Sequence, residues 1–495
     1  MMSIFIDNLL PIPQVGISGT GIDFNVNFYR ITMPAHTVTP VFGTHEKWRI
    51  NRNILILGFA FMIHFTAFHG TANLQSSVNS DAGAGAFTLA AIYGSLILSN
   101  IFLPAIVIKW LGCKWTMSVS FIAYMPFIAA QFYPKLYTLV PAGLMVGFGG
   151  GPLWCAKCTY LSVVSEPYAK LSGVNKDVLV VRFFGLFFMF YQMAQIWGNL
   201  ISSSSNSDAI DFGATCGANF CSGSAGHVNA NLEPPSPAKI QLIAGVFLAC
   251  MVSAIVLVCF KYLNANLFRY SAGRKTTGEG ISGLRLLAVT LRQLRHKYQL
   301  LLLPVIGFIG AEQAFMAADF TQAFVGCAYG INNIGYVMIC FGVFNALAAP
   351  VAGSIVKITG RFPVMLTALV SLSLNTIIIK DLDEISWLVF YVLAAVWGTA
   401  DAVWLVQVNA LSGILFPGNE EAAYSNFRLW EATGSVIAYA SAPYMCAGIR
   451  IYVLLGILIA GFIGYTIIEI MEYKAKRSHH AERNFQLVKK GDDMM

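Results

Sequence analysis

Charged residues are scarce in this sequence of 495 residues. Asp, Glu, Lys and Arg together make up 11% of it, whereas hydrophobic residues make up 57% and the mean hydropathy is +0.65. An ordinary soluble protein is about one quarter charged, so the composition excludes that class. It predicts that lipid surrounds most of the chain.

The motifs of common enzyme classes are also absent. No cluster of His, Cys, Asp or Glu has metal-ligand spacing, and no nucleophile–base motif or dinucleotide fingerprint occurs. The glycine run that ends at Pro152 lacks the spacing and the following Lys-Ser/Thr of a phosphate-binding loop. We therefore expect no enzyme activity, no cofactor and no metal.

Apolar runs of membrane-spanning length recur along the chain. A spanning helix needs roughly 20 apolar residues to cross about 30 Å of hydrocarbon. Runs of this kind predict an all-α membrane protein with twelve transmembrane helices. The predicted spans are Asn53–Gly70, Phe87–Ile108, Trp115–Phe132, Leu136–Leu161, Val178–Ile201, Ile240–Tyr262, Tyr298–Ala318, Asn333–Val356, Pro363–Ile379, Ile385–Leu411, Phe427–Cys446 and Ile451–Ile470.

Basic residues predict the orientation, because Lys and Arg are retained on the cytoplasmic side during insertion. With the N-terminus inside, all but four of the 31 Lys and Arg residues fall on inner segments or inner helix ends. The four outer ones are Lys135, Lys239, Lys380 and Arg450. Both termini are therefore predicted to be cytoplasmic. The net charge of +7 indicates topology and contact with anionic membrane lipid, and gives no case for nucleic acid.

A long inner loop divides the predicted spans into two sets of six, as in a duplicated transporter fold. The predicted organisation is a cytoplasmic tail (1–52), a first six-helix bundle (53–262), a linker (263–297), a second bundle (298–470) and a cytoplasmic tail (471–495). Near the end of the linker, Ile281–Tyr298 sets leucines against basic residues at helical spacing. This stretch is either a basic amphipathic helix that lies on anionic lipid or an ordinary connecting helix.

Two similar short motifs, which lie half the chain apart, support the interpretation as two related halves. Both resemble the cytoplasmic loop signature of the major facilitator superfamily, which predicts two pseudo-symmetric six-helix halves. That signature has an acidic residue at one position, and both motifs of this chain have lysine there. The charge relay that the signature forms in true carriers therefore lacks its acid. The signature residues are Lys109, Gly112 and Lys114 in the first half, and Lys357, Gly360 and Arg361 in the second.

Acidic residues inside predicted spans are the main functional candidates, because a charge in hydrocarbon is costly and usually faces protein or water. Glu312 and Asp401 lie deep in their spans, and Trp404 and Gln407 lie on a face near Asp401. We predict that Glu312, Asp401, Gln407 and Glu431 form a central polar site for a cation or proton. The alternative is a set of interhelical hydrogen bonds that fixes packing.

Basic and histidine side chains inside spans receive a structural interpretation. Lys157, Arg182 and Arg428 lie near predicted cytoplasmic helix ends, where long side chains reach the interface. His64 and His69 could join a central cavity, but such histidines are more often hydrogen-bonded packing residues.

Small residues predict close helix packing in the fourth span. Gly143, Gly147 and Gly151 recur at spacings of four, which lets a neighbouring helix approach. We favour packing within the bundle over an oligomer face. Together with Trp404 and Trp430 they are our candidates for helix-packing or partner contacts.

Three cysteines lie on predicted outer loops, where oxidation is allowed. These are Cys216, Cys221 and Cys327. We expect one disulfide among them, with Cys216 and Cys221 as the candidate pair.

Several longer motifs resemble those of the uncoordinated-93-like (Unc-93) family, a divergent branch of the major facilitator superfamily. The resemblance covers about Asn53 to Tyr465 and leaves both tails unmatched. The motifs are Asn73–Asn79, Leu111–Lys114, Gly151–Tyr160, Glu312–Phe315, Trp397–Trp404 and Phe427–Glu431.

This resemblance implies regulation rather than catalysis. The founding member is similar to an accessory subunit of a two-pore potassium channel, and a vertebrate relative escorts receptors out of the endoplasmic reticulum. The favoured hypothesis is therefore a potassium channel regulator in the plasma membrane that packs laterally against channel subunits. The alternatives are a trafficking chaperone, in the endoplasmic reticulum or endosomal membrane, and a secondary transporter that uses Glu312, Asp401 and Glu431.

Overall fold

The computed structural model describes residues 45–78, 84–202, 216–220, 236–259, 289–329, 331–380, 387–441 and 445–492. The regular elements within these residues are all helical. The first half contains α2 (His45–Val78), α3 (Ala84–Phe102), α4 (Pro104–Ala129), α5 (Leu136–Ser172), α6 (Lys176–Ser202), η3 (Gly217–Asn219) and α7 (Pro237–Cys259). The second contains α10 (Val289–Gln293), α11 (Lys297–Ala314), the π-helix η5 (Phe315–Gly326), α12 (Cys327–Tyr329), α13 (Ile331–Thr359), α14 (Arg361–Lys380), α15 (Trp387–Leu415), α16 (Glu420–Ser441) and α17 (Ala447–Asp492).

Ten helices in the described segments are long and apolar enough to cross a membrane. The sequence predicted twelve spans, and the two that fall short are α3 and α16. The apolar part of α3 is short, although hydrogen bonds through Leu103 continue it into α4. Helix α16 begins with Glu420 and Glu421 and carries a further ion pair, which lowers its hydropathy.

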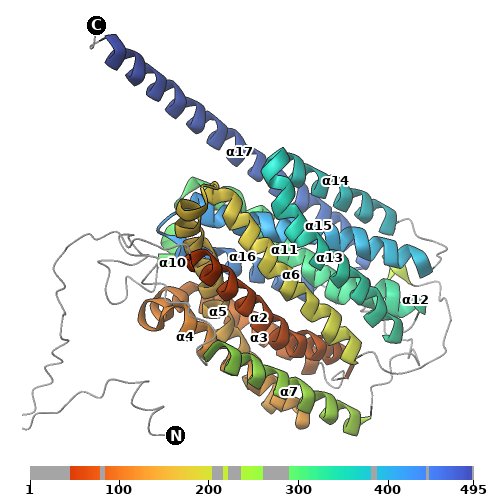
Figure 1. The fold of residues 1–495 in the computed structure, drawn as a ribbon. Coiled ribbons are helices and arrows are strands. Elements are labelled where there is room, and N and C mark those ends of the chain that lie inside the picture. The colour runs from red at the N-terminus through yellow and green to blue at the C-terminus, as the bar shows by residue number, and fades with distance from the viewer. Residues whose placement is uncertain are drawn as a thin grey trace, which may run out of the picture. The chain divides into compact units, whose positions relative to one another are not determined.

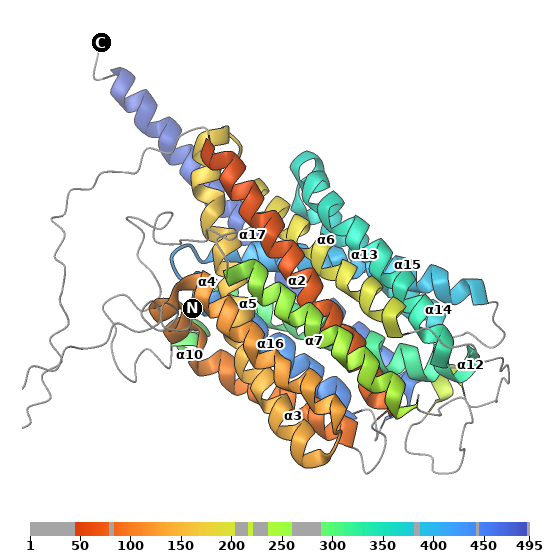
Figure 2. The ribbon, with the colours of Figure 1, turned by 60° about the horizontal axis from the view of Figure 1, so that its bottom comes forward.

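The two halves meet along their lateral helices. Helix α6 packs extensively on α13 (Figure 1). Helix α3 packs on α16. Helix α5 of the first half also contacts α15 and α16 of the second. In the view turned by 60°, α2 lies beside α6 and α7 (Figure 2). One continuous hydrophobic core therefore runs through both halves.

The two signature motifs occupy equivalent turns. Gly112 breaks α4 and Gly360 separates α13 from α14. Their φ values are positive, 69° and 85°, a conformation that glycine adopts without a Cβ penalty. Arg361 follows the second turn, and its Nε lies 3.7 Å from a carboxylate oxygen of Glu469 on α17. In the first motif, Lys114 lies over the ring of Trp115. Lys109 is exposed, and the side chain of Lys357 lies outside the described residues.

Two segments outside the spans differ from the prediction. The amphipathic stretch Ile281–Tyr298 is described from residue 289 onward, and there the helix α10 ends at Gln293, followed by a turn before Lys297. The prediction of a continuous helix over the last part of this stretch is therefore wrong. The tail predicted from residue 471 continues α17 as helix to Asp492, which extends beyond the other helices in Figure 1.

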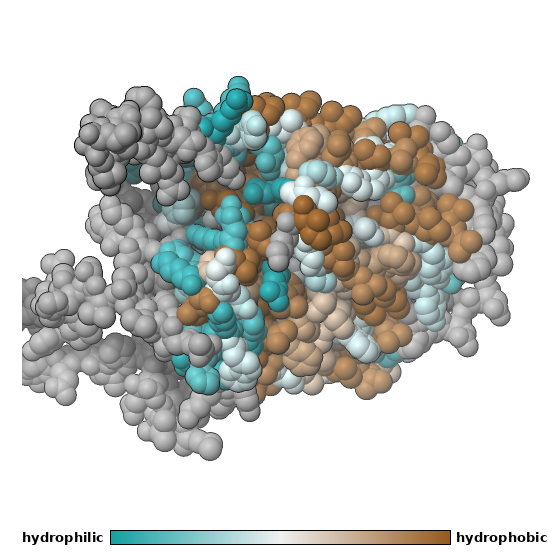
Figure 3. Space-filling model, turned by 45° about the horizontal axis from the view of Figure 1, so that its top comes forward, coloured by the Kyte–Doolittle hydropathy of each residue, from teal (hydrophilic) through white to brown (hydrophobic). Residues whose placement is uncertain are grey.

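Apolar side chains cover much of the surface that lipid would contact. In Figure 3 hydrophobic residues spread over one face, and hydrophilic ones gather toward the left of the view. Exposed examples include Leu347 on α13, Leu374 on α14 and Ile463 on α17. An exposed apolar surface of this kind suits a membrane protein, because lipid replaces water around it.

Close approach of helices depends on glycine in both halves. A Cβ at Gly147 would overlap the carbonyl oxygen of Ile92 on α3, and Gly143 and Gly151 face the same helix. The glycine stripe therefore packs within the bundle, as favoured from the sequence. Gly310 on α11 plays the corresponding part in the second half, where a Cβ would overlap the Glu431 carbonyl oxygen on α16.

We expect Gly310→Ala to lower the melting temperature clearly, whereas Gly307→Ala on the same helix leaves it unchanged or raises it slightly. A methyl group at residue 310 forces α11 and α16 apart, an overpacking cost of about 1–3 kcal/mol. A Cβ at residue 307 meets no atom within 4 Å among the described residues. Thermal unfolding of both variants in detergent measures this difference, and equal melting temperatures would contradict the packing described.

Candidate functional site

A pair of buried carboxyl groups lies inside the second half. Glu312 on α11 is 0% exposed and Asp401 on α15 is 1% exposed. The indole Nε1–H of Trp397 donates to Glu312 Oε1, and Asn345 Nδ2 on α13 donates to Asp401 Oδ2 at 2.5 Å. The two carboxyl groups are also hydrogen-bonded to each other. Because an ionised carboxylate only accepts, one of the two must hold a proton in this arrangement.

The carboxyl pair has one further partner, because Gln313 of α11 is also hydrogen-bonded to Asp401. Within the described residues, Asn345 Oδ1 is buried without a hydrogen-bond partner. No salt bridge joins either acid to a Lys or Arg within the same segments. The π-helix η5 begins three residues after Glu312, and such wide helical turns are frequent at functional sites. The arrangement can therefore hold and release one proton.

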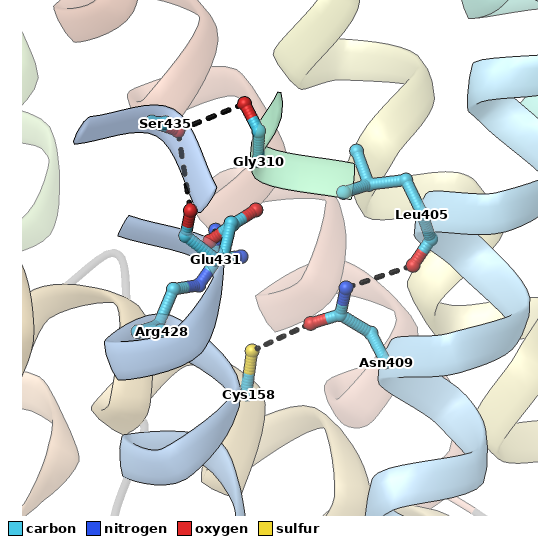
Figure 4. Close-up of polar contacts among 7 residues, drawn as sticks. All are labelled: Cys158, Gly310, Leu405, Asn409, Arg428, Glu431 and Ser435. Atoms are coloured by element: carbon cyan, nitrogen blue, oxygen red, sulfur yellow. Dashed lines mark hydrogen bonds and ion pairs between the residues drawn. The ribbon is translucent and has the colours of Figure 1, made fainter. Parts of the chain in front are cut away.

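Glu431 is hydrogen-bonded to neither acid of the pair, although its charge acts on Asp401 through space. Its Oε2 accepts from Arg428 Nη1 at 2.5 Å, because Arg428 lies three residues earlier on the same face of α16 (Figure 4). Ser435 donates to the carbonyl oxygens of Gly310 and Glu431, which fixes α16 against α11. The predicted site thus separates into a carboxyl pair and an ion pair.

The other predicted site residues lie nearby in the core. Gln407 is 1% exposed, and neither of its amide atoms has a hydrogen-bond partner in the described chain. Trp404 is fully buried between Phe308 and Phe462, so it packs within the second half. Trp430 is partly buried against the same core. No group of His, Cys, Asp or Glu suited to a metal occurs in the part of the chain that the structure describes.

Two basic residues, Lys157 and Arg428, are more central than the sequence indicated. Both were interpreted as reaching the interface from helix ends. Helix α5 continues to Ser172, however, and α16 begins at Glu420, so both side chains lie well inside their helices. Lys157 is 0% exposed and Arg428 is 6% exposed. The missed signal was their aromatic neighbourhood, in particular Trp154 one turn before Lys157.

The histidines pack among aromatic rings of the first half. His64 stacks on Phe121, with ring centroids 4.1 Å apart. His69 shares a hydrogen bond with Gln195 of α6 at 3.2 Å. His69 fits the interpretation of a hydrogen-bonded packing residue, whereas His64 packs with neither ring nitrogen hydrogen-bonded to a described residue.

A disulfide joins the halves at the end of the bundle opposite Gly112 and Gly360. Cys216 bonds Cys327, with Cα atoms 5.6 Å apart. The predicted pairing of Cys216 with Cys221 is therefore wrong, because the fold brings α12 beside η3 and pairs Cys216 with Cys327. Cys221 itself lies outside the described residues. The same segment is held further where Ala447 N donates to the Phe220 carbonyl oxygen at 2.9 Å. Next to it, Arg450 pairs with Asp319 of η5.

We expect Glu312→Gln to fold with nearly normal stability, whereas Glu312→Leu loses about 1–3 kcal/mol. The glutamine amide oxygen can accept from Trp397, and its amide NH₂ can donate to Asp401 as the protonated acid does. Leucine leaves the Trp397 N–H and the Asp401 carboxylate buried without this partner. Thermal unfolding of both variants measures the difference, and equal losses would argue against a proton-sharing pair.

Comparison with solved structures defines the fold class. The human organic anion transporter MFSD10 superposes with a TM-score of 0.61 at 11% identity, over 84% of this chain and 99% of that one. Since this likeness shows the fold alone, the chain has the fold of the major facilitator superfamily: a multi-pass α-helical membrane protein with two related halves.

Sequence comparison gives the family within that class. The model of a family described as "Ion channel regulatory protein UNC-93" matches residues 76–382. Protein unc-93 homolog A of Xenopus laevis is 40% identical over 433 residues, 85% of this chain and 94% of that protein. The "Putative potassium channel regulatory protein unc-93" of Caenorhabditis elegans is 33% identical over 450 residues, which are 88% of this chain and 63% of that one. The chain belongs to the UNC-93 family.

Proposed function

We propose that this protein is an accessory, regulatory subunit of a potassium channel, which it contacts laterally within the plasma membrane. The names of its family and of its nematode relative refer to channel regulation. The proposal includes both termini on the cytoplasmic side, where the basic residues also contact anionic lipid. It includes no enzyme activity.

The observation that supports regulation over transport is the disulfide between the halves. A carrier of this fold alternates by rocking one half against the other. Here Cys216 of the first half is bonded to Cys327 of the second, and Phe220 is hydrogen-bonded to Ala447 beside it. These links limit separation at that end of the bundle. A scaffold held in one arrangement presents a constant surface to a neighbouring channel.

The loop signature supports the same proposal. Lys109 and Lys357 stand where carriers keep an acid, so the charge relay of the signature is missing. To regulate a channel, the protein must contact its two gating states differently, because equal contacts shift no equilibrium. Lateral packing of exposed apolar helices can supply such contacts.

We expect co-expression with a two-pore potassium channel to change the potassium current per channel at the cell surface. Whole-cell current and surface biotinylation of the channel, measured on the same cells, give this ratio. A proportional rise of both quantities would indicate a trafficking chaperone instead. No change in either quantity would contradict both the regulator and the chaperone.

The carboxyl pair favours a second candidate, proton-coupled transport. Glu312 and Asp401 share a proton in a buried site that lacks a cationic partner in the described chain. Proton-dependent solute uptake that is lost in Glu312→Gln would support a carrier. Normal channel regulation in that variant would assign the pair to packing.

A further inference from the structure

An aromatic cage surrounds the ammonium group of Lys157 in the first half. Its Nζ lies 4.2 Å from the ring centroid of Phe187, 4.5 Å from Phe188, 4.9 Å from Trp154 and 5.3 Å from Phe184. The rings attract a cation through their faces. The side chain is fully buried, Nζ has no nitrogen or oxygen partner among the described residues, and the thiol of Cys158 beside it is a weak acceptor. The cage therefore holds the charge in place without neutralising it.

Arg428 of the second half faces the same indole. Its Cζ lies 4.1 Å from the centroid of Trp154. Only Nη1 is used for Glu431, whereas Nε and Nη2 are buried without a partner in the described segments. Nε and Nη2 form one edge of the planar guanidinium, and such an edge makes two parallel hydrogen bonds to a carboxylate or phosphate.

Lys157 has no carboxylate at ion-pair distance among the described residues. The carboxylate of Glu431 pairs with Arg428, and the one negative charge that Glu312 and Asp401 share is held by Trp397 and Asn345. A buried cation without a direct counter-ion is costly, so an anion placed against Lys157 and the free edge of Arg428 would be stabilised there.

We propose that Lys157 and Arg428 form a binding site, between the two halves, for an organic monoanion with an apolar body, such as an amphipathic carboxylate. The carboxylate occupies the free edge of Arg428 and approaches the Lys157 ammonium. The four rings contact its apolar part. This site is separate from the carboxyl pair and does not depend on the proposed channel function.

The location of the site couples binding to the arrangement of the halves. Lys157 and the rings belong to α5 and α6, whereas Arg428 belongs to α16. The free donor atoms are buried between these helices, so a bound anion bridges the two halves. A bound anion should therefore stabilise the folded protein against heat.

Octanoate tests the site in purified full-length protein reconstituted in nanodiscs. Thermal unfolding with increasing octanoate should show a saturable rise in melting temperature. Acetate has the charge without the apolar body, and 1-octanol has the apolar body without the charge, so both should give smaller shifts. Oleate placed in the nanodisc lipid tests entry from the membrane, and a saturable shift by either route supports the site.

Variants assign the effect to the two cations. We expect two variants to weaken octanoate binding at least about tenfold each. They are Lys157→Met and Arg428→Lys, the second of which keeps the positive charge but loses the planar edge that makes two parallel hydrogen bonds. Lys170→Met is the matched control on α5, because Lys170 is exposed and pairs with Glu166 at the surface. Should octanoate and oleate stabilise the wild-type protein no more than 1-octanol does, the proposal is overturned, whether or not the variants fold. Equal octanoate affinity in folded Lys157→Met and wild-type protein overturns it as well.

Discussion

Arg428→Met will destabilise the protein by about 3–5 kcal/mol, the usual cost of removing one partner of a buried ion pair. Glu431 is only 8% exposed, and its carboxylate depends on Arg428 Nη1. Methionine fills a similar volume but leaves that carboxylate without its hydrogen-bonded cation, so that only Lys157 acts on it through space. The free energy of unfolding, measured by denaturant titration in mixed micelles, gives the loss.

A double-mutant cycle separates this charge effect from packing. Arg428→Met combined with Glu431→Leu removes both charges and should recover more than half of the loss. The matched control is Arg49→Met on α2. Arg49 also pairs with an acid three residues away, Glu46 at 3.8 Å, but is about one third exposed. Its loss should stay below about 1 kcal/mol. If the double variant were as unstable as the sum of its single variants, the buried pair would not be the cause.

Loss of the disulfide between the halves should lower stability by about 2–5 kcal/mol. The bond closes a loop of 111 residues and joins α12 to the segment before η3. One cysteine alone cannot form the bond. The variants Cys216→Ser, Cys327→Ser and the double variant should therefore all lose the same free energy of unfolding. Melting temperatures under non-reducing conditions give the comparison.

Cys250→Ser on α7 is the control, since Cys250 is a free cysteine away from the bond. It should leave the melting temperature within the scatter of the wild type. Reducing agent should lower the wild-type value at least to that of Cys216→Ser, because Cys446 is disulfide-bonded as well. Losses that add in the double variant would show that the two thiols act separately.

The sequence was sufficient for the fold class, because hydrophobic length is a local property of the chain. Runs such as Pro363–Ile379 and Ile451–Ile470 lie inside observed helices. The resemblance to the Unc-93 family was also correct. The glycines at 112 and 360 marked the equivalent turns, because each needs a positive φ.

The site was predicted less well, since hydropathy does not show polar helical turns that are buried against protein. Helix α16 begins at Glu420 rather than near Phe427, and α5 ends at Ser172 rather than near Leu161. These shifts moved Arg428 and Lys157 from predicted helix ends into the interior. The pairing of Cys216 with Cys327 depends on contact between distant segments, which spacing along the chain does not determine.

The carboxyl pair could be predicted in part. Burial of Glu312 and Asp401 followed from their depth in apolar spans. Their partners Asn345 and Trp397 come from α13 and α15, and they became apparent only once those helices were placed. Glu431 was separated from the pair by a local effect, the arginine three residues before it.

The most direct test of channel regulation is a recording from purified components. A two-pore potassium channel reconstituted in a planar bilayer, with and without this protein, removes trafficking from the experiment. We predict that the open probability of single channels changes by about fivefold or more when the protein is present, the size of a typical coupling free energy. An unchanged open probability, with both proteins shown to be in the same bilayer, would contradict the account.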